Sequence, residues 1–199
     1  TFPRDLFAGK TVIVTGSGDG IGAAIAVLFA AHGARVAVHD LREDSARRIL
    51  SVIAEQGGEG DAFVADLARP GDADRLFGEA ADRFGTIDIL VNNAGRSWAV
   101  DTADIDPDRA DALIELDLMA ALWLTKACIG HLKARAAPGS IVQIASTAGV
   151  LGFRRRAVYT AATHGLVGLT RALALDHAHE GIRINAVLPH VIETPMYRT

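Results

Sequence analysis

Short apolar runs alternate with longer stretches of helical periodicity along the whole chain. The apolar runs predict strands near residues 11–15, 35–39, 61–65, 87–91, 139–145 and 183–188. The stretches between them predict helices near residues 20–32, 42–56, 70–84, 107–135 and 157–179. Strands that alternate with helices over short connections are typical of a parallel sheet with helices on both faces. The pattern therefore predicts an α/β fold built on a doubly wound parallel sheet.

The alternation continues without an internal repeat, a low-complexity tract or a linker, so residues 1–199 are expected to form a single domain. Two of the predicted helical stretches, residues 112–132 and 158–175, are apolar on more than one face. A helix that lies on a sheet and exposes its back to water needs only one apolar face. We therefore expect a partner subunit to cover the other face, in a homodimer or a homotetramer.

Composition narrows the possible partners. The formal net charge is −4, so nucleic acid is not an expected partner. The three consecutive arginines at 154–156 are interpreted as a solvated loop or a subunit contact, with a contribution to a catalytic site as the alternative.

The single cysteine, Cys128, is interpreted as a small core residue in a reducing compartment. No metal-ligand motif is present and no apolar stretch approaches the ~18 residues of a membrane span, so neither a metal nor a membrane is expected as a partner. The expected location is the cytoplasm.

The most informative motif is a glycine-rich turn between the first predicted strand and the first predicted helix, Thr15-Gly16-Ser17-Gly18-Asp19-Gly20-Ile21-Gly22. Glycines let the backbone approach a pyrophosphate closely, and the free N–H groups at the start of a helix favour negative charge. An acid, Asp40, ends the next apolar run, where such folds place a carboxylate against the ribose hydroxyls of adenosine. A bare glycine turn is equally compatible with a turn that holds no ligand. The order strand, turn, helix and carboxylate favours a dinucleotide.

Two further motifs follow at the ends of later predicted strands. Asn92-Asn93-Ala94-Gly95 follows the fourth strand, Ser146 ends the fifth, and Tyr159 comes thirteen positions later on the next helix. With the T-G-x-x-x-G-x-G turn, these motifs make the chain resemble the short-chain dehydrogenase/reductase family over residues 10–196. The resemblance implies a three-layer Rossmann fold and a nicotinamide cofactor. It also implies that Ser146 holds the substrate oxygen and that Tyr159 donates or removes the proton.

The resemblance further implies a series of cofactor contacts along one edge of the sheet. They comprise the phosphate turn, a pair of residues beside the adenine, a wall behind the ribose and a segment that reaches the nicotinamide carboxamide. The expected cofactor-binding residues are Gly16, Ser17, Asp19, Gly20, Ile21, Gly22, Asp40, Leu41, Asp66, Leu67, Asn93, Ala94, Gly95, Tyr159, Pro189, Ile192 and Thr194.

Asp40 also predicts which nicotinamide cofactor is bound. A carboxylate accepts hydrogen bonds from two ribose hydroxyls, and it repels a 2′-phosphate. NAD(H) is therefore favoured over NADP(H). Arg42 stands two residues later and is interpreted as a solvated cation in the first turn of a helix.

Three positions depart from the family pattern. Thr163 stands four residues after Tyr159, where the family carries a lysine that lies under the tyrosine and lowers its pKa. Asp117 stands where the family has an asparagine of the proton relay, and His190 follows Pro189 where the family has a glycine. The catalytic candidates are Ser146, Tyr159, Asp117 and Thr163. As a substitute acid or base His190 ranks above His164, although a surface or packing role is the alternative for both histidines.

Substrate recognition is the part that the sequence predicts least. The resemblance implies a helical lid and a last strand beyond Thr199, which either belong to a longer chain or have been removed by a truncation. The candidate pocket residues that remain are Arg96, Ser97, Trp98, Leu151 and Phe153.

Three functional hypotheses follow from these motifs. The first is an NAD(H)-dependent oxidoreductase that interconverts a secondary alcohol and a ketone, with a weakened or rewired proton step. The second is an NAD-binding protein without redox turnover, acting as a sensor or a partner subunit. The third is a non-redox dehydratase or cyclase that uses Asp117 or His190 as the base in the same pocket.

Overall fold

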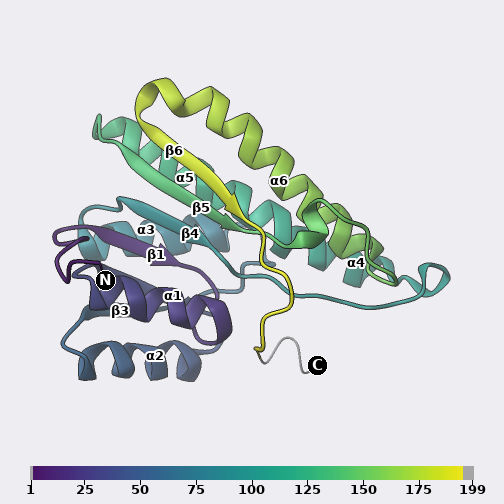
Figure 1. The fold of residues 1–199 in the computed structure, drawn as a ribbon, viewed down its shortest axis with the longest axis horizontal. Coiled ribbons are helices and arrows are strands. Elements are labelled where there is room, and N and C mark those ends of the chain that lie inside the picture. The colour runs from purple at the N-terminus through teal and green to yellow at the C-terminus, as the bar shows by residue number, and fades with distance from the viewer. Residues whose placement is uncertain (1, 195–199) are drawn as a thin grey trace.

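The computed structural model describes residues 2–194 and folds them around one parallel sheet of six strands. The strands are β1 (Thr11–Val14), β2 (Arg35–Asp40), β3 (Glu59–Val64), β4 (Ile89–Asn92), β5 (Gly139–Ile144) and β6 (Ile182–Val187). Their order across the sheet is β3-β2-β1-β4-β5-β6, so the chain winds outward from β1 in two directions (Figure 1). The predicted α/β fold with a doubly wound parallel sheet is confirmed.

The helices lie where the apolar periodicity predicts them, with one difference. They are α1 (Gly20–Ala31), α2 (Glu43–Glu55), α3 (Asp72–Phe84), α4 (Pro107–Ile114), α5 (Ala120–Ala134) and α6 (Ala157–His177). The stretch predicted as one helix over 107–135 is interrupted, because a π-helical segment, Glu115–Met119, joins α4 to α5. Such a segment inserts one extra residue into a helical turn and is frequent at functional sites. Among the described helices, none has the length and apolar character needed to cross a membrane.

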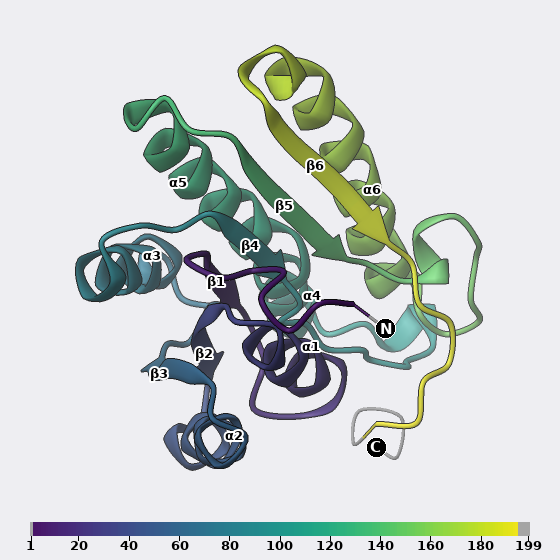
Figure 2. The same cartoon turned by 60° about the vertical axis from the view of Figure 1, so that its left-hand side comes forward.

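Helices cover both faces of the sheet (Figures 1 and 2). α1 and α2 pack on β1, β2 and β3 from one side, whereas α3, α5 and α6 lie on the opposite side. In the edge strand β6, Ile182 and Ile184 are buried toward α5 and α6, and Arg183, Asn185 and Val187 are exposed on the α1 side. The sheet therefore forms the middle of three layers.

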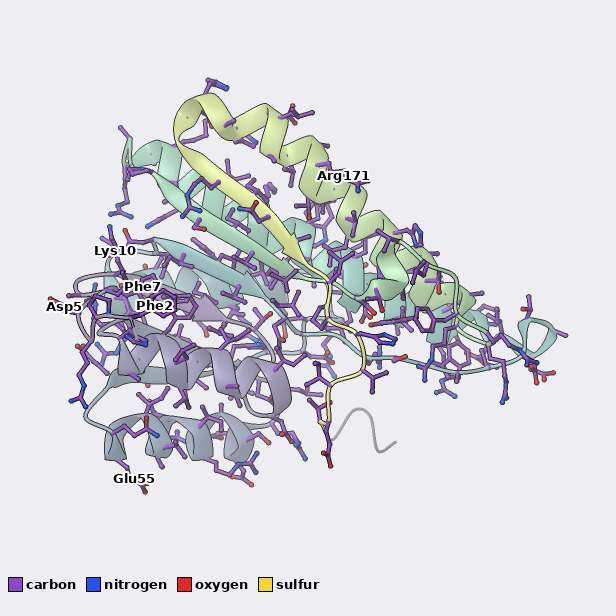
Figure 3. The ribbon with its side chains drawn as sticks, viewed as in Figure 1. Phe2, Asp5, Phe7, Lys10, Glu55 and Arg171 are labelled. Carbon is purple, nitrogen blue, oxygen red and sulfur yellow. The ribbon has the colours of Figure 1, made fainter. Side chains whose placement is uncertain are left out.

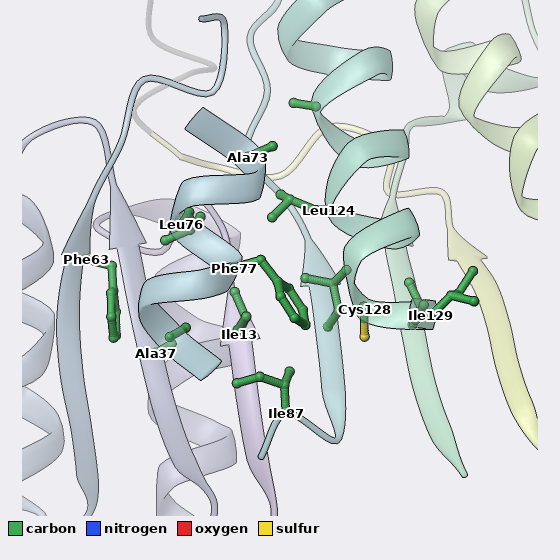
Figure 4. Close-up of a cluster of buried hydrophobic side chains, with 14 of the residues drawn as sticks. Ile13, Ala37, Phe63, Ala73, Leu76, Phe77, Ile87, Leu124, Cys128 and Ile129 are labelled. Atoms are coloured by element: carbon green, nitrogen blue, oxygen red, sulfur yellow. The ribbon is translucent and has the colours of Figure 1, made fainter. Parts of the chain in front are cut away.

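The larger core cluster fills the space between the sheet and the helices α3 and α5 (Figure 4). Phe77 extends from α3 toward Ile13 of β1 and Cys128 of α5. Cys128 is fully buried, and burial raises the pKa of its thiol to about 12, so the thiol stays neutral. The prediction that Cys128 is a small core residue is confirmed.

The chain enters the sheet at the amino ends of the strands, where Phe7 and Lys10 lie (Figure 3). Phe7 packs against Phe29 of α1, with the ring centroids 4.7 Å apart. The buried Asp88 accepts a hydrogen bond from the N–H of Thr11 at 3.0 Å and pairs with Lys10 at 3.6 Å. These contacts attach the first residues of the chain to the amino edge of the sheet.

Candidate active site

The carboxyl ends of the central strands open into a cleft of about 570 Å³. It lies where β1 and β4 are neighbours and the winding direction reverses, which is where doubly wound sheets bind ligands. Most of the predicted site residues line it, namely Gly16, Asp19, Gly20, Ile21, Asp40, Asn93, Ala94, Gly95, Asp117, Ser146, Tyr159, Thr163, Pro189, Ile192 and Thr194. Segments far apart in the sequence thus meet in one cavity.

The glycine turn at one wall of the cleft leaves no room for side chains. Gly16 and Gly20 have φ angles of 59° and 53°, which glycine adopts without strain. A Cβ on Gly16 would lie 2.8 Å from the Cα of Ala94, and one on Gly22 would lie 2.4 Å from the Nδ2 of Asn93. The turn therefore packs directly against the loop that follows β4.

The helix after this turn, α1, begins at the cleft. Asp19 is its N-cap and accepts a hydrogen bond from the N–H of Gly20 at 2.6 Å. The N–H groups of Ile21 and Gly22 find no acceptor within residues 2–194. Free N–H groups and the positive end of the helix dipole together form a binding site for an anion.

Asn93 holds the ends of β1 and β4 together. Its N–H and that of Ala94 donate to the Oγ1 of Thr15 at 2.9 and 3.0 Å. Its side-chain Nδ2 donates to the carbonyls of Thr15 and Gly16 at 2.9 and 3.0 Å. The donors of this side chain are therefore engaged in shaping the cleft wall.

His39 in β2 supports the glycine turn, and the sequence reasoning missed it. Its Nδ1 accepts from the N–H of Gly16 at 3.2 Å, and its Nε2 lies 3.2 Å from the carbonyl of Ala65. Burial lowers the pKa of His39, so the neutral ring with the proton on Nε2 satisfies both contacts. The one available signal was a polar residue inside an otherwise apolar strand, directly before Asp40.

Asp40 ends β2 and faces the glycine turn. One carboxylate oxygen accepts from the N–H of Gly18 at 3.2 Å, and the other accepts from the N–H of Arg42 at 3.0 Å. A Cβ on Gly18 would lie 2.6 Å from the Asp40 carboxylate, so only glycine fits beside it. These contacts hold the carboxylate at the edge of the cleft.

Ser146 and Tyr159 lie together at the other end of the cleft. Ser146 follows β5, and its Oγ accepts from the N–H of Ala148 at 3.1 Å. Burial raises the pKa of Tyr159, and a hydrogen bond with Ser146 and the positive charge of Arg156 lower it, while the negative charge of Asp117 raises it further. The two hydroxyls that the resemblance pairs are therefore neighbours in space.

Thr163 stands one turn after Tyr159 on α6 and is buried at the cleft wall. Its hydroxyl donates to the carbonyls of Tyr159 and Thr160 at 2.9 and 3.2 Å. The side chain therefore satisfies its own helix and supplies no charge to the tyrosine.

Asp117 lies in the π-helical segment and points into the cleft. Its Oδ1 accepts a hydrogen bond from the N–H of Arg96 at 3.0 Å. Burial raises the pKa of Asp117 to about 7, against the opposing hydrogen bond and charge of Arg96. At neutral pH this carboxyl is therefore close to half protonated.

The segment after β6 crosses the cleft. The N–H of Thr147 donates to the carbonyl of Pro189 at 3.0 Å, and the side chain of Thr147 is hydrogen bonded to the Nδ1 of His190 at 3.1 Å. Thr194 lies over the glycine turn, since a Cβ on Gly20 would be 3.2 Å from its methyl group. His190 therefore belongs to the cleft.

Several predicted residues lie outside the lining of the cleft. Ser17 is fully buried, and its hydroxyl donates to the carbonyl of Val14 at 2.8 Å. The remaining cofactor candidates outside it are Gly22, Leu41, Asp66 and Leu67. His164 is exposed and bonded to its own helix, as its position next to Thr163 predicts.

Of the residues predicted to form the substrate pocket, some line the cleft and others lie outside it. The three of its residues that line the cleft are Arg96, Ser97 and Phe153. Trp98 lines an adjoining pocket of about 220 Å³, where the guanidinium of Arg109 lies 4.3 Å from its ring centroid. Leu151 is exposed and lines neither cavity.

A glycine turn that joins a buried strand to a helix at the switch point of a doubly wound sheet defines a dinucleotide-binding protein of the Rossmann class. The family model for short chain dehydrogenase matches residues 10–199. The chain belongs to the short-chain dehydrogenase family.

Relatives with assigned activities support this membership. Trans-4-hydroxycyclohexanecarboxylate dehydrogenase of Sinomonas cyclohexanicum is 39% identical over 198 residues, which cover 96% of this chain and 76% of that protein. A proposed short-chain alcohol dehydrogenase from Sinorhizobium meliloti 1021 superposes with a TM-score of 0.92 at 33% identity, over 97% of this chain and 76% of the other. A proposed 2-deoxy-D-gluconate 3-dehydrogenase from Agrobacterium tumefaciens, solved with bound NADP, has a TM-score of 0.89 at 37% identity, over 98% and 76%. An oxidoreductase that acts on CH–OH groups is therefore supported.

Proposed function

We propose that this protein is an NAD(H)-dependent oxidoreductase that interconverts a secondary alcohol and a ketone. The observation that carries the proposal is that Ser146 and Tyr159 are neighbours in the cleft that also contains the glycine turn. A hydride acceptor and a proton acceptor must both reach the same carbon–oxygen group, and one cleft brings the two sites together.

The residues along the cleft fit a dinucleotide. The free N–H groups of Ile21 and Gly22 would hold the pyrophosphate, and Asp40 would accept hydrogen bonds from the adenosine ribose. Pro189, Ile192 and Thr194 would line the nicotinamide. The bound nicotinamide supplies the site that accepts the hydride in oxidation or returns it in reduction.

Tyr159 is the proposed acid and base. In oxidation the carbinol carbon loses a hydride and the hydroxyl proton passes to the Tyr159 oxygen, and in reduction that proton returns to the carbonyl oxygen. Ser146 would donate a hydrogen bond to the substrate oxygen, on which negative charge develops. Because burial raises the pKa of Tyr159, the phenolate that oxidation needs is disfavoured.

The proton step is proposed to be weakened or rewired. No charge comes from Thr163, whose hydroxyl bonds to the carbonyl of Tyr159. Asp117 and His190 are the other titratable groups of the lining near the substrate end, and either provides an alternative acceptor for the proton. Asp117 is the stronger candidate, because its pKa of about 7 suits proton transfer in both directions at neutral pH.

The preference for NAD(H) rests on Asp40 alone. Its carboxylate is held at the edge of the cleft by the N–H groups of Gly18 and Arg42, where a 2′-phosphate would meet its negative charge. The Agrobacterium tumefaciens relative holds NADP, so the solved relatives do not support this choice. A direct comparison of the two cofactors is therefore required.

A second candidate function is cofactor binding without turnover. It is favoured by Thr163, because the tyrosine has no cation on its own helix face one turn later. In that case the glycine turn and Asp40 keep their roles, and Tyr159 is a binding residue only.

One experiment separates these functions. NADH and NADPH are titrated calorimetrically into the 199-residue chain, and a carbonyl panel is then followed by nicotinamide absorbance at about 340 nm. We expect NADH to bind more tightly than NADPH and to be consumed with at least one ketone. Tyr159→Phe should slow this consumption by about 100-fold or more while NADH still binds. Saturable NADH binding with no consumption selects the second candidate, and no saturable binding of either cofactor contradicts both.

The assembly and compartment stay predictions. We propose a homodimer or homotetramer through the outward faces of α5 and α6, where Leu175 is 83% exposed. The proposed compartment is the cytoplasm, in keeping with a single buried thiol.

A further inference from the structure

The three consecutive arginines before α6 have three different environments. Arg154 is exposed, and Arg155 is exposed and pairs with Asp101 at 3.2 Å. Arg156 is half-buried, lines the cleft and donates a hydrogen bond to the Oγ of Ser97. The interpretation as a solvated loop therefore holds for the first two arginines and is wrong for Arg156.

The backbone before α6 keeps these environments apart. Arg155 has a φ of 61°, a left-handed conformation that is unfavourable for a residue with a Cβ. Its carbonyl accepts from the N–H of Val100 at 2.7 Å, and its side chain pairs with Asp101, so the loop after β4 holds this conformation. Unfavourable backbone conformations that are held in place by surrounding contacts are frequent at functional sites. Here it directs Arg155 outward and Arg156 into the cleft.

The cleft is polarised along its length. Two of its three acidic lining residues, Asp19 and Asp40, belong to the glycine turn and the end of β2, at the cofactor end, and the third is Asp117. Arg156 lies at the other end, beside Tyr159, whose pKa its charge lowers. Within residues 2–194 no carboxylate lies at ion-pair distance from Arg156. A half-buried guanidinium without an acidic partner favours an anionic ligand.

The other charged groups at this end do not neutralise Arg156. The guanidinium of Arg96 donates to the carbonyl of Ala112 at 2.8 Å. Asp117 accepts from the N–H of Arg96, and its raised pKa leaves it only partly ionised at neutral pH. Within residues 2–194, the guanidinium of Arg156 therefore has no carboxylate or carbonyl partner, so its donors are available to a ligand.

On the basis of the proposed function, we propose that the substrate carries a carboxylate, which Arg156 binds beside Ser97 while the alcohol or ketone lies at Ser146 and Tyr159. The planar guanidinium presents paired N–H donors that match the two oxygens of a carboxylate. The hydroxyl of Ser97 accepts from Arg156 and keeps its own proton to donate to the same anion. The substrate class is therefore hydroxycarboxylates and their keto acids, rather than neutral alcohols.

The test compares ligands that differ only in charge. The wild-type chain saturated with NADH is assayed with 2-, 3- and 4-oxocarboxylates and with the corresponding amides. We expect kcat/KM to favour the best carboxylate over its amide, and Arg156→Gln to reduce that ratio by roughly 10- to 100-fold. The matched control is Arg154→Gln, which removes the same charge from an exposed neighbour and should leave the ratio unchanged.

Two outcomes overturn the inference. One is a wild-type enzyme that uses the amides as well as the carboxylates, and the other is an Arg156→Gln variant that slows both ligand classes equally. Failure of the proposed function is distinguished by calorimetry with the same ligands on the NADH complex. Carboxylate binding that depends on Arg156 but gives no turnover supports the anion site and contradicts the oxidoreductase.

Discussion

At the scale of single residues, Tyr159 is the group whose chemistry depends most on its neighbours. Burial raises its pKa, Ser146 and Arg156 lower it, and Asp117 raises it further. Thr163, one turn later on the same helix, adds no charge because its hydroxyl bonds to the backbone. The pKa of the tyrosine is therefore set by burial and by three side chains from three separate segments, Ser146, Arg156 and Asp117.

Thr163→Lys should raise turnover by about 10- to 100-fold and shift to lower pH the limb of the alcohol-oxidation profile along which the rate rises with pH. The physical reason is that an ammonium group one helical turn from Tyr159 stabilises its phenolate. The measurement is kcat/KM against pH for the wild type and the variant. His164→Lys adds the same charge on the exposed side of α6 and should change neither. Unaltered rates in a folded Thr163→Lys variant would mean that the proton leaves by another route.

At the scale of elements, the π-helical segment between α4 and α5 determines the environment of Asp117. The residue is 7% exposed, and within residues 2–194 its side chain accepts one hydrogen bond, from the N–H of Arg96 in the loop after β4. β4, the loop after it and the π segment together therefore place a carboxyl group with a pKa of about 7 beside Tyr159, the proposed acid and base.

This burial predicts a pH dependence of stability. An aspartate in an unfolded chain has a pKa of about 3.9, so between roughly pH 4 and pH 7 the folded protein binds the extra proton at Asp117. The free energy of unfolding should therefore fall as pH rises through this window, by on the order of 4 kcal/mol in total. Asp117→Asn keeps an oxygen for the N–H of Arg96 and should abolish that contribution.

Urea unfolding at pH 5 and pH 8 measures this effect. The free energy of unfolding of Asp117→Asn minus that of the wild type should be larger at pH 8 than at pH 5. The exposed Asp111 on α4 supplies the control, because Asp111→Asn should shift stability equally at both values. Parallel behaviour of the two variants would show that Asp117 is ionised at little cost in the folded state.

At the scale of the whole molecule, the outward face of α6 is the proposed contact surface for a partner subunit. Leu175 is 83% exposed there, whereas Leu28, 59% exposed, lies on α1 at the opposite face of the sheet. We expect the wild type to sediment as a dimer or tetramer at micromolar concentration, and Leu175→Glu to shift it toward the monomer because a charge would be desolvated in the interface. Leu28→Glu should leave the assembly intact. A monomeric wild type would contradict the prediction.

The sequence by itself determined the order and type of the elements. Strand and helix signals are local, since they depend on apolar spacing within a few positions, and the glycine turn is a run of adjacent residues. The Ser146 to Tyr159 interval is short enough for the end of β5 and the start of α6 to lie close together at the carboxyl edge of the sheet. For that reason most residues predicted from motifs line one cleft.

The tertiary structure alone decided which side chains meet and how they are charged. Asn93 contacts Thr15 across 78 sequence positions, and Arg156 contacts Ser97 across 59, so no local sequence pattern predicts either contact. The burial that brings the pKa of Asp117 to about 7 arises from a π segment that shifts the helical spacing by a single residue. Periodicity and spacing act along the chain, whereas desolvation and charge pairing act through space, and the substrate end of this cleft is built from the second kind of contact.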